Sequence, residues 1–193
     1  MINRLVIIAS GAVLALGGCS KHDDGNVASG DNIIVTDNTV DNGLAANDAA
    51  ASPLTAQGFA NAAAASDNFE IQTSQLAATN GSSAAVKKFA TQMIAAHTAS
   101  TAKLKATLAG QSPAVTPDPT LTPEQQSTLD SLKAQTGAAF DSAYAAAQVD
   151  AHQKTLDALK AYAASGDNDA LKGFAKDMVP TVTAHLNMAK GLK

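Results

Sequence analysis

An internal repeat constrains the fold of this chain more than any other feature. The segment Val86–Ile94 (VKKFATQMI) aligns with Leu171–Val179 (LKGFAKDMV), and the same register pairs Gly81 with Gly166. In both copies apolar residues recur at three- and four-residue spacing, which is typical of one face of a helix. The repeat therefore predicts two similar helical hairpins.

Composition also favours helices. Of the 193 residues 46% are hydrophobic, and much of this fraction is alanine, whereas aromatic residues make up 4% and tryptophan is absent. Small aliphatic side chains suit closely packed helices better than a β-sandwich, which needs Val, Ile and aromatic residues. We therefore expect an all-α domain.

Glycines and capping residues place the ends of the expected helices. Thr122 and Gln125 form a capping-box pattern at the start of a short helix, and Asp167 is the expected cap of the last helix. Pro180 should kink that last helix. The expected ranges are about 55–80, 83–110, 122–137, 138–165 and 167–193. The two hairpins should then pack as an up-down-up-down four-helix bundle, with the short helix in the connection between them.

The N-terminal sequence predicts an export signal. The apolar run Leu5–Leu16 follows Arg4 and is about 12 residues long, too short to span a bilayer but suited to a signal peptide. Two glycines then precede Cys19, the only cysteine. This order resembles the bacterial lipobox, in which the cysteine is lipidated. We expect residues 1–18 to be removed as a signal peptide rather than kept as an anchor, and Cys19 to be the lipidation site. By the same resemblance to the lipobox, Ser20 after the cysteine favours sorting to the outer membrane, with the protein facing the periplasm.

The segment after the cysteine is predicted to be a flexible linker. Residues 19–55 contain six aspartates, many Asn and Gly residues and no aromatic residue, which is typical of a disordered acidic linker. The folded domain is then expected over 56–193.

Charge limits the partners. The formal net charge is −4, and Arg4, the only arginine, lies in the segment expected to be removed. Nucleic-acid binding depends on basic patches, so we expect no nucleic-acid partner. The expected contacts are the membrane, through the lipid on Cys19, and an envelope protein.

Several spaced elements occur in order across roughly residues 56–192. They are Phe59, Glu70, Val86–Thr98, Gly137, Phe140, Asp141, Tyr144, Asp150–His152 and Leu171–Leu186. In these residues the domain resembles a bacterial envelope family called domain of unknown function 4142, which is ferritin-like. This resemblance implies a ferritin-like bundle and an envelope location, and it implies no activity.

Four residues form the one candidate site that the sequence offers. His97, His152 and His185 fall on three different expected helices, and Glu70 falls on the remaining long one. Helix rise places all four at similar depth in an antiparallel bundle. Histidine and carboxylate ligands suit Zn, Fe, Mn or Cu. The sequence thus offers a transition-metal site in the bundle core.

Two interpretations of this layer stay open. Buried histidines often form hydrogen bonds across helices, and such a polar layer without a metal is the favoured interpretation. If an ion binds, Met93 and Met188, one turn from His97 and His185, would favour copper. A di-iron ferroxidase centre is rejected, because such centres need Glu three residues before His on two helices. Those positions hold Ile94, Val149 and Val182.

The expected function follows these alternatives. The first expectation is a non-enzymatic envelope lipoprotein whose helical module binds a partner or supports the envelope, with no cofactor. The second is a metal-binding or redox protein that uses His97, His152, His185 and Glu70. Hydrolase activity has no support, because the serines form no recognisable triad pattern.

Overall fold

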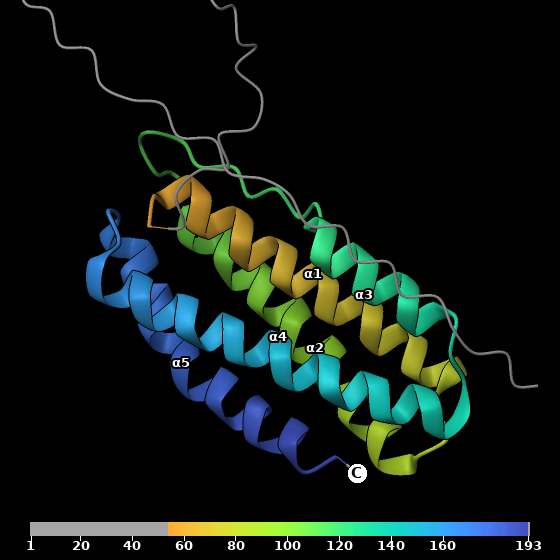
Figure 1. Ribbon diagram of the computed structural model, residues 1–193. Helices are drawn as coiled ribbons and strands as arrows, with labels where there is room; N and C mark the ends of the chain where they lie inside the picture. Colours follow the sequence, from red (N-terminus) through yellow and green to blue (C-terminus); the bar gives the residue numbers. More distant parts are fainter. Residues whose placement is uncertain (1–53, 193) are drawn as a thin grey trace, which may run out of the picture. The chain divides into compact units, whose positions relative to one another are not determined.

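The computed structural model describes residues 54–192. The predicted signal peptide, Cys19 and nearly all of the predicted linker lie outside these residues. The helices are α1 (Ala56–Asn80), α2 (Ala84–Leu108), α3 (Pro123–Lys133), α4 (Gly137–Ser165) and α5 (Asp169–Lys190) (Figure 1). Residues 54–192 contain no strand, which confirms the predicted all-α class. None of these helices is both long and apolar enough to cross a membrane.

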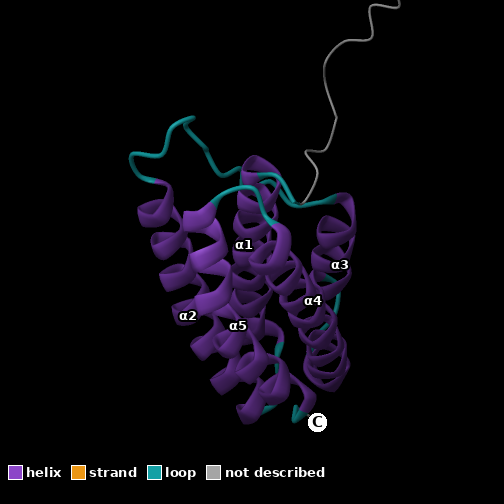
Figure 2. Cartoon of the chain, turned by 90° about the vertical axis from the view of Figure 1, so that its left-hand side faces the viewer, coloured by secondary structure: helices purple, strands orange, loops and turns teal. Residues whose placement is uncertain are grey.

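The long helices form a bundle of two antiparallel hairpins. α1 packs mainly on α2, and α4 packs mainly on α5. The hairpins join through contacts of α1 with α4 and of α2 with α5, while the short helix α3 lies against α1 and α4 (Figure 2). The predicted pair of hairpins and the short connecting helix are therefore confirmed. The predicted up-down-up-down order is wrong, because Asp141 near the start of α4 contacts Ser82 and Ser83 just before α2, so α2 and α4 run in the same direction. The connection that contains α3 returns the chain to the end of the bundle where α2 begins (Figure 1).

Two apolar clusters fill the core of the bundle. One contains Phe59, Leu104, Leu156, Tyr162 and Phe174 among others. The other is built around Val86, Phe89, Met93, Phe140 and Tyr144. On each long helix, buried polar residues lie close to where the stretch that supplies one cluster gives way to the stretch that supplies the other. They are Asp67, Glu70, Thr73 and Ser74 on α1, His97 and Ser100 on α2, Gln148 and His152 on α4, and His185 on α5. A polar layer therefore crosses the middle of the core.

The start of α4 ties the two hairpins together. Asp141 accepts hydrogen bonds from the backbone amides of Ser82 (3.1 Å) and Ser83 (2.8 Å), which lie in the turn before α2. The same carboxylate accepts the hydroxyl of Ser82. Free amides at a helix start need acceptors, and here the other hairpin supplies one. This contact fixes where α4 meets the α1–α2 turn.

Most helix ends lie close to the predicted positions, and one predicted cap is wrong. The capping box of Thr122 and Gln125 is present at the start of α3. The cap of α5 is Asn168, which accepts the amide of Leu171 at 3.0 Å, and not Asp167. Asp167 instead accepts the hydroxyl of Tyr162 at 2.9 Å, so its carboxylate is already engaged.

The connection between α3 and α4 also differs from the prediction. α3 ends at Lys133, several residues before the predicted stop at Gly137. Gly137 is instead the first residue of α4, with φ of +64°, a conformation that glycine adopts without strain. The glycine marks the turn into the next helix rather than the end of the previous one. Pro180 lies inside α5, which continues on both sides of it.

Candidate metal centre

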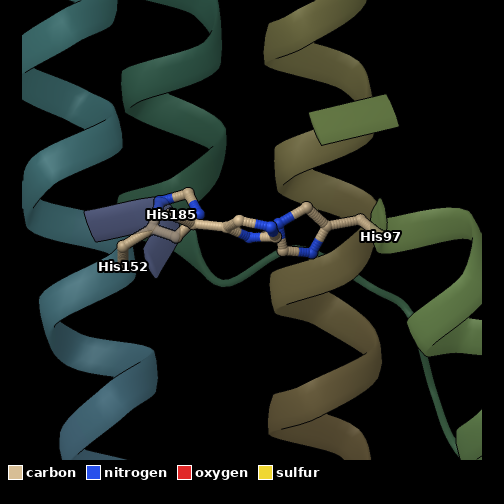
Figure 3. A group of neighbouring side chains, drawn as sticks. All are labelled: His97, His152 and His185. Carbon is tan, nitrogen blue, oxygen red and sulfur yellow. The ribbon is translucent and has the colours of Figure 1, made fainter. Parts of the chain in front are cut away.

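Three histidines meet in the polar layer. His97 comes from α2, His152 from α4 and His185 from α5, and all three are buried. One ring nitrogen of each lies within 4.8 Å of a ring nitrogen of the other two. The ring centroids are 5.6 to 5.8 Å apart, so they form a nearly regular triangle. Figure 3 shows the three side chains pointing toward one another. Three of the four predicted site residues are thus brought together.

Hydrogen bonds fix the orientation of two of the rings. Nδ1 of His97 lies 2.8 Å from Oδ1 of Asp67 on α1, and Nδ1 of His152 lies 2.8 Å from the backbone carbonyl oxygen of Gln148. A carbonyl or carboxylate oxygen can only accept, so Nδ1 carries the hydrogen in both rings. The lone pair of each neutral ring is then on Nε2. Thr101 donates to the other oxygen of Asp67 at 3.0 Å and holds the carboxylate in place.

One buried nitrogen of each ring has no hydrogen-bond partner among the described residues. These atoms are Nε2 of His97, Nε2 of His152 and Nδ1 of His185. A buried polar atom without a partner is costly and uncommon. His97 and His152 thus have the pattern of metal-binding histidines, in which one nitrogen donates to a carboxylate or carbonyl and the other faces the ion.

The spacing of the ring nitrogens suits a shared ion after a small contraction. An ion equidistant from three nitrogens 4.8 Å apart would lie about 2.8 Å from each, and Zn–N bonds are about 2.0–2.1 Å long. Each ring would need to move inward by about 0.7 Å, which side-chain rotation can supply. The triangle could therefore hold one ion if the three rings moved inward by this amount.

The protonation states of His152 and His185 favour binding of a cation, whereas His97 would have to release a proton to bind one. Burial lowers the pKa of His152 to about 4, helped by the nearby charges of His97 and His185. Burial and the charge of His97 likewise lower the pKa of His185 to about 4. Both rings are therefore neutral near pH 7, the form that binds metals. Burial also opposes the charged form of His97, but the hydrogen bond to Asp67 and the charges of Glu70 and Asp67 outweigh it and raise the pKa of His97.

Glu70 lies beside the triangle and is not part of the group that could share one ion. Its Oε1 is 3.6 Å from Nδ1 of His152, on the side of that ring bonded to the carbonyl of Gln148. The residue is fully buried, and burial raises the pKa of its carboxyl group to about 7, more than the charge of His97 and the Gln148 side chain lower it. Glu70 therefore lies beside the His152 ring, on the side away from Nε2, the nitrogen that could bind an ion.

The repeat register contains a signal for Asp67, one of the two supporting residues that were not predicted from the sequence; it contains none for Gln148. Asp67 and Gln148 are both buried. The register that pairs Gly81 with Gly166 superposes Asp67 on His152, and Ser100 on His185. Positions that are equivalent in the two hairpins thus face the same central layer. Because Asp67 is equivalent to His152, the repeat predicts that Asp67 also faces this layer.

The prediction that Met188 lies beside the histidines is wrong. Met93 is fully buried within the apolar cluster around Phe89, and Met188 is 40% exposed, so Met188 does not face the core layer. Another methionine, Met178, lines the space beside His97 and His185. The sequence spacing of one turn selected Met188, whereas the rotation of α5 turns that residue outward.

Comparison with known proteins identifies one family. The family described as a domain of unknown function (DUF4142) matches residues 42–192, which include all five helices. The match begins within the segment predicted to be a linker. No curated protein and no solved structure matches the chain.

Proposed function

The chain belongs to the DUF4142 family, and because the description of that family assigns no activity, we propose a function from the site itself. His97, His152 and His185 bind a single transition-metal ion in the core of the bundle. The protein captures and holds this ion. Holding an ion needs no reacting substrate, which agrees with the non-enzymatic role expected from the sequence.

The unpartnered nitrogens are the observation that carries this proposal. A hydrogen-bonded polar layer without a metal would pair the buried ring nitrogens with donors or acceptors on other helices. Here one nitrogen of each ring is left without such a partner, and the three rings converge. The geometry therefore favours the metal interpretation over the polar layer that the sequence alone favoured.

The donor set favours zinc or copper. Imidazole ligands suit Zn²⁺ and Cu²⁺, and Cu²⁺ binds most tightly to a given nitrogen site. A di-iron centre needs bridging carboxylates, but Asp67 is engaged by His97 and Thr101, and Glu70 lies behind His152. We also propose the ferritin-like topology for this bundle, a fold in which metals sit between facing helices.

The proposed location follows from the N-terminal sequence. The lipobox-like order at Cys19 supports export and lipidation, and Ser20 supports sorting to the outer membrane. The bundle would then hold its ion on the periplasmic side, on a lipid anchor that binds stably when two or more acyl chains are present. Membrane fractionation tests this part, because Cys19→Ser should release or mislocalise the protein. A Cys19→Ser variant that stays anchored like the unaltered chain would contradict it.

Elemental analysis tests the metal proposal. The full chain, purified in detergent, is loaded with Zn²⁺, Cu²⁺, Fe²⁺ and Mn²⁺ in turn and then washed free of excess ion. We expect one Zn²⁺ or Cu²⁺ per chain, and we expect its loss in a His97→Ala, His152→Ala double variant. The matched control is His22→Ala, which removes the only histidine outside the described bundle and should leave ion binding unchanged.

Two results would contradict the metal proposal. One is an unaltered chain that binds none of the four ions more tightly than micromolar. The other is a double variant that retains the ion at full stoichiometry while circular dichroism shows that it remains helical.

A further inference from the structure

A small cavity borders the three-histidine triangle on one side. Its volume is about 30 Å³, and all four long helices contribute to its lining. His97 and His185 lie in its wall, together with Asp67, Ser100 and Met178. One water needs about 10–15 Å³ measured in this way, so the cavity holds one or two waters and no larger organic molecule.

Three nitrogens leave a tetrahedral ion with one unfilled position. Zinc sites that exchange ligands keep three protein ligands and a fourth position for water or substrate, whereas structural sites fill all four. Resting on the metal function proposed above, we propose that the ion keeps this fourth position open toward the cavity. Its exogenous ligand is then a molecule the size of water or a small anion.

A larger pocket at the surface lies on the other side of the cavity wall. It has a volume of about 320 Å³ and is lined by α1, α4 and the start of α3. Four residues line both spaces: Ala63, Ser66, Thr155 and Leu159. The partition between the surface pocket and the metal cavity is therefore one layer of side chains thick.

The hydroxyl pair in this partition is its most permeable point. The oxygens of Ser66 and Thr155 are 2.8 Å apart and form a hydrogen bond across α1 and α4. Both side chains are small and only partly buried. Either hydroxyl can exchange its partner for a passing water or anion, which alanine and leucine cannot do. The exogenous ligand accordingly enters from the surface pocket through the Ser66–Thr155 pair.

Charged residues stand at the mouth of this pocket. Lys154 bridges Glu124 of α3 and Asp150 of α4 at 2.6 and 2.9 Å. All three are exposed, so their ion pairs exchange readily with solvent. The mouth therefore presents both signs of charge, and the Lys154 ammonium is the group there that can attract a small anion.

Two other features of this region could change the proposed site: a different fourth ligand of the ion and a different route of entry. Met178 lines the cavity, and its thioether sulfur would close the fourth position if it bound the ion. A second surface cavity, beneath the loop between α2 and α3, includes Thr101, which donates to Asp67. Entry through that cavity would bypass the hydroxyl pair. The experiment below separates both arrangements from the proposed one.

Azide is the probe, because it is a small anion that binds open positions of transition metals. The full chain is loaded with Cu²⁺, or with Co²⁺ if Zn²⁺ is the preferred ion, and the ion content is measured first. Azide should then change the visible spectrum of the bound ion. Ser66→Leu, which fills the partition, should slow this change on the order of tenfold, an added barrier of about 1.4 kcal/mol. Ile71→Phe, in the second surface cavity, is the matched control and should leave the rate unchanged.

A second variant keeps the test decisive if Ser66→Leu does not fold. Thr155→Ser keeps the hydroxyl and removes the methyl group of the other side chain of the pair, so it should accelerate azide binding at unchanged ion content. An ion-loaded chain whose spectrum azide never changes would overturn the proposal, as would a change that appears only after Met178→Leu. A rate lowered by Ile71→Phe and not by Ser66→Leu would overturn the proposed route. A chain that binds no ion contradicts the metal function itself, which the first measurement reveals.

Discussion

Asp67 is the side chain that most directly prepares the candidate site. It accepts the Nδ1 hydrogen of His97 at 2.8 Å, so the lone pair of that ring is on the nitrogen without a partner. A carboxylate in this position also makes the imidazole a stronger ligand. The site therefore depends on a residue of α1 that would not itself touch the ion.

Asp67→Asn should weaken ion binding without removing a ligand. Loss of a supporting partner of this kind costs about 10–100-fold in metal affinity. The measurement is a competition titration against a chelator of known affinity. Asp177→Asn, an exposed acid on α5, is the control and should bind like the unaltered chain. Equal affinities in all three proteins would show that Asp67 has no part in the site.

Phe89→Ala should destabilise the fold. Phe89 is 3% exposed, and its ring meets the edges of Tyr144 and His152 at centroid distances of 6.2 and 6.3 Å. Truncation of a buried phenylalanine costs about 3–5 kcal/mol of unfolding free energy. Urea unfolding followed by circular dichroism measures the loss, with the exposed neighbour Lys88→Ala as control. A midpoint that Phe89→Ala leaves unchanged would mean that this face of α2 does not pack in the core.

The individual residues of the site were only partly predictable. Three- and four-residue spacing placed His97 and His185 on apolar faces, because core positions follow the helical period. The same periodicity fixes the rotation of a helix only roughly, so it could not separate Glu70, which lies behind His152, from the converging rings. Met188 was misplaced for the same reason.

Among the helices, the contact of α4 with the α1–α2 turn is the one most open to test. Asp141→Ala removes the acceptor for two backbone amides at the start of α2. Loss of such a cap costs about 1–2 kcal/mol. The expected result is a lower urea midpoint than that of Asp157→Ala, which removes an exposed acid from the same helix. Equal midpoints would show that the contact does not stabilise the packing of the hairpins.

Helix ends were predictable where the local sequence signals agreed on one position. Thr122, Pro123 and Gln125 begin α3 because the cap, the proline and the box agree. Asp167 and Asn168 are both good caps, and only the hydrogen bond from Tyr162 to Asp167 decides between them. That hydrogen bond depends on the placement of the Tyr162 side chain, which the local sequence signals do not fix.

The polar layer makes the whole bundle sensitive to pH in the absence of metal. Burial holds the pKa of His152 and His185 near 4, below their ordinary 6.5. Stability that depends on their neutral forms is fully present above pH 6.5 and is lost as pH falls toward 4. Glu70 acts in the opposite direction, since its raised pKa gives stability that is present below pH 4.5 and lost toward pH 7. The raised pKa of His97 likewise gives stability that is present below pH 6.5 and is lost as pH rises.

His152→Gln should therefore show a smaller loss of stability between pH 6.5 and 4 than the unaltered chain does. The measurement is the urea midpoint at several pH values with a chelator present, and Gln153→Ala, on the exposed side of α4, is the control. Identical pH profiles for the His152 variant and the unaltered chain would contradict the neutral, buried state of this ring.

The architecture as a whole was the most predictable feature. The repeat, the alanine-rich composition and the periodic apolar faces all indicate two packed hairpins, and the described residues form them. The chemistry was less predictable because it depends on distances between helices that are far apart in sequence. His97, His152 and His185 come from three helices, and only their packing brings the nitrogens within 4.8 Å.

X-ray absorption at the edge of the bound metal tests the assignment of these three ligands most directly. The spectrum of the ion-loaded chain should show three imidazole nitrogens at about 2.0–2.1 Å and one further light atom. The His97→Ala, His152→Ala variant, given the same ion, should lose this imidazole signal. A spectrum without imidazole scattering, or one dominated by sulfur or carboxylate ligands, would contradict a metal centre built from His97, His152 and His185.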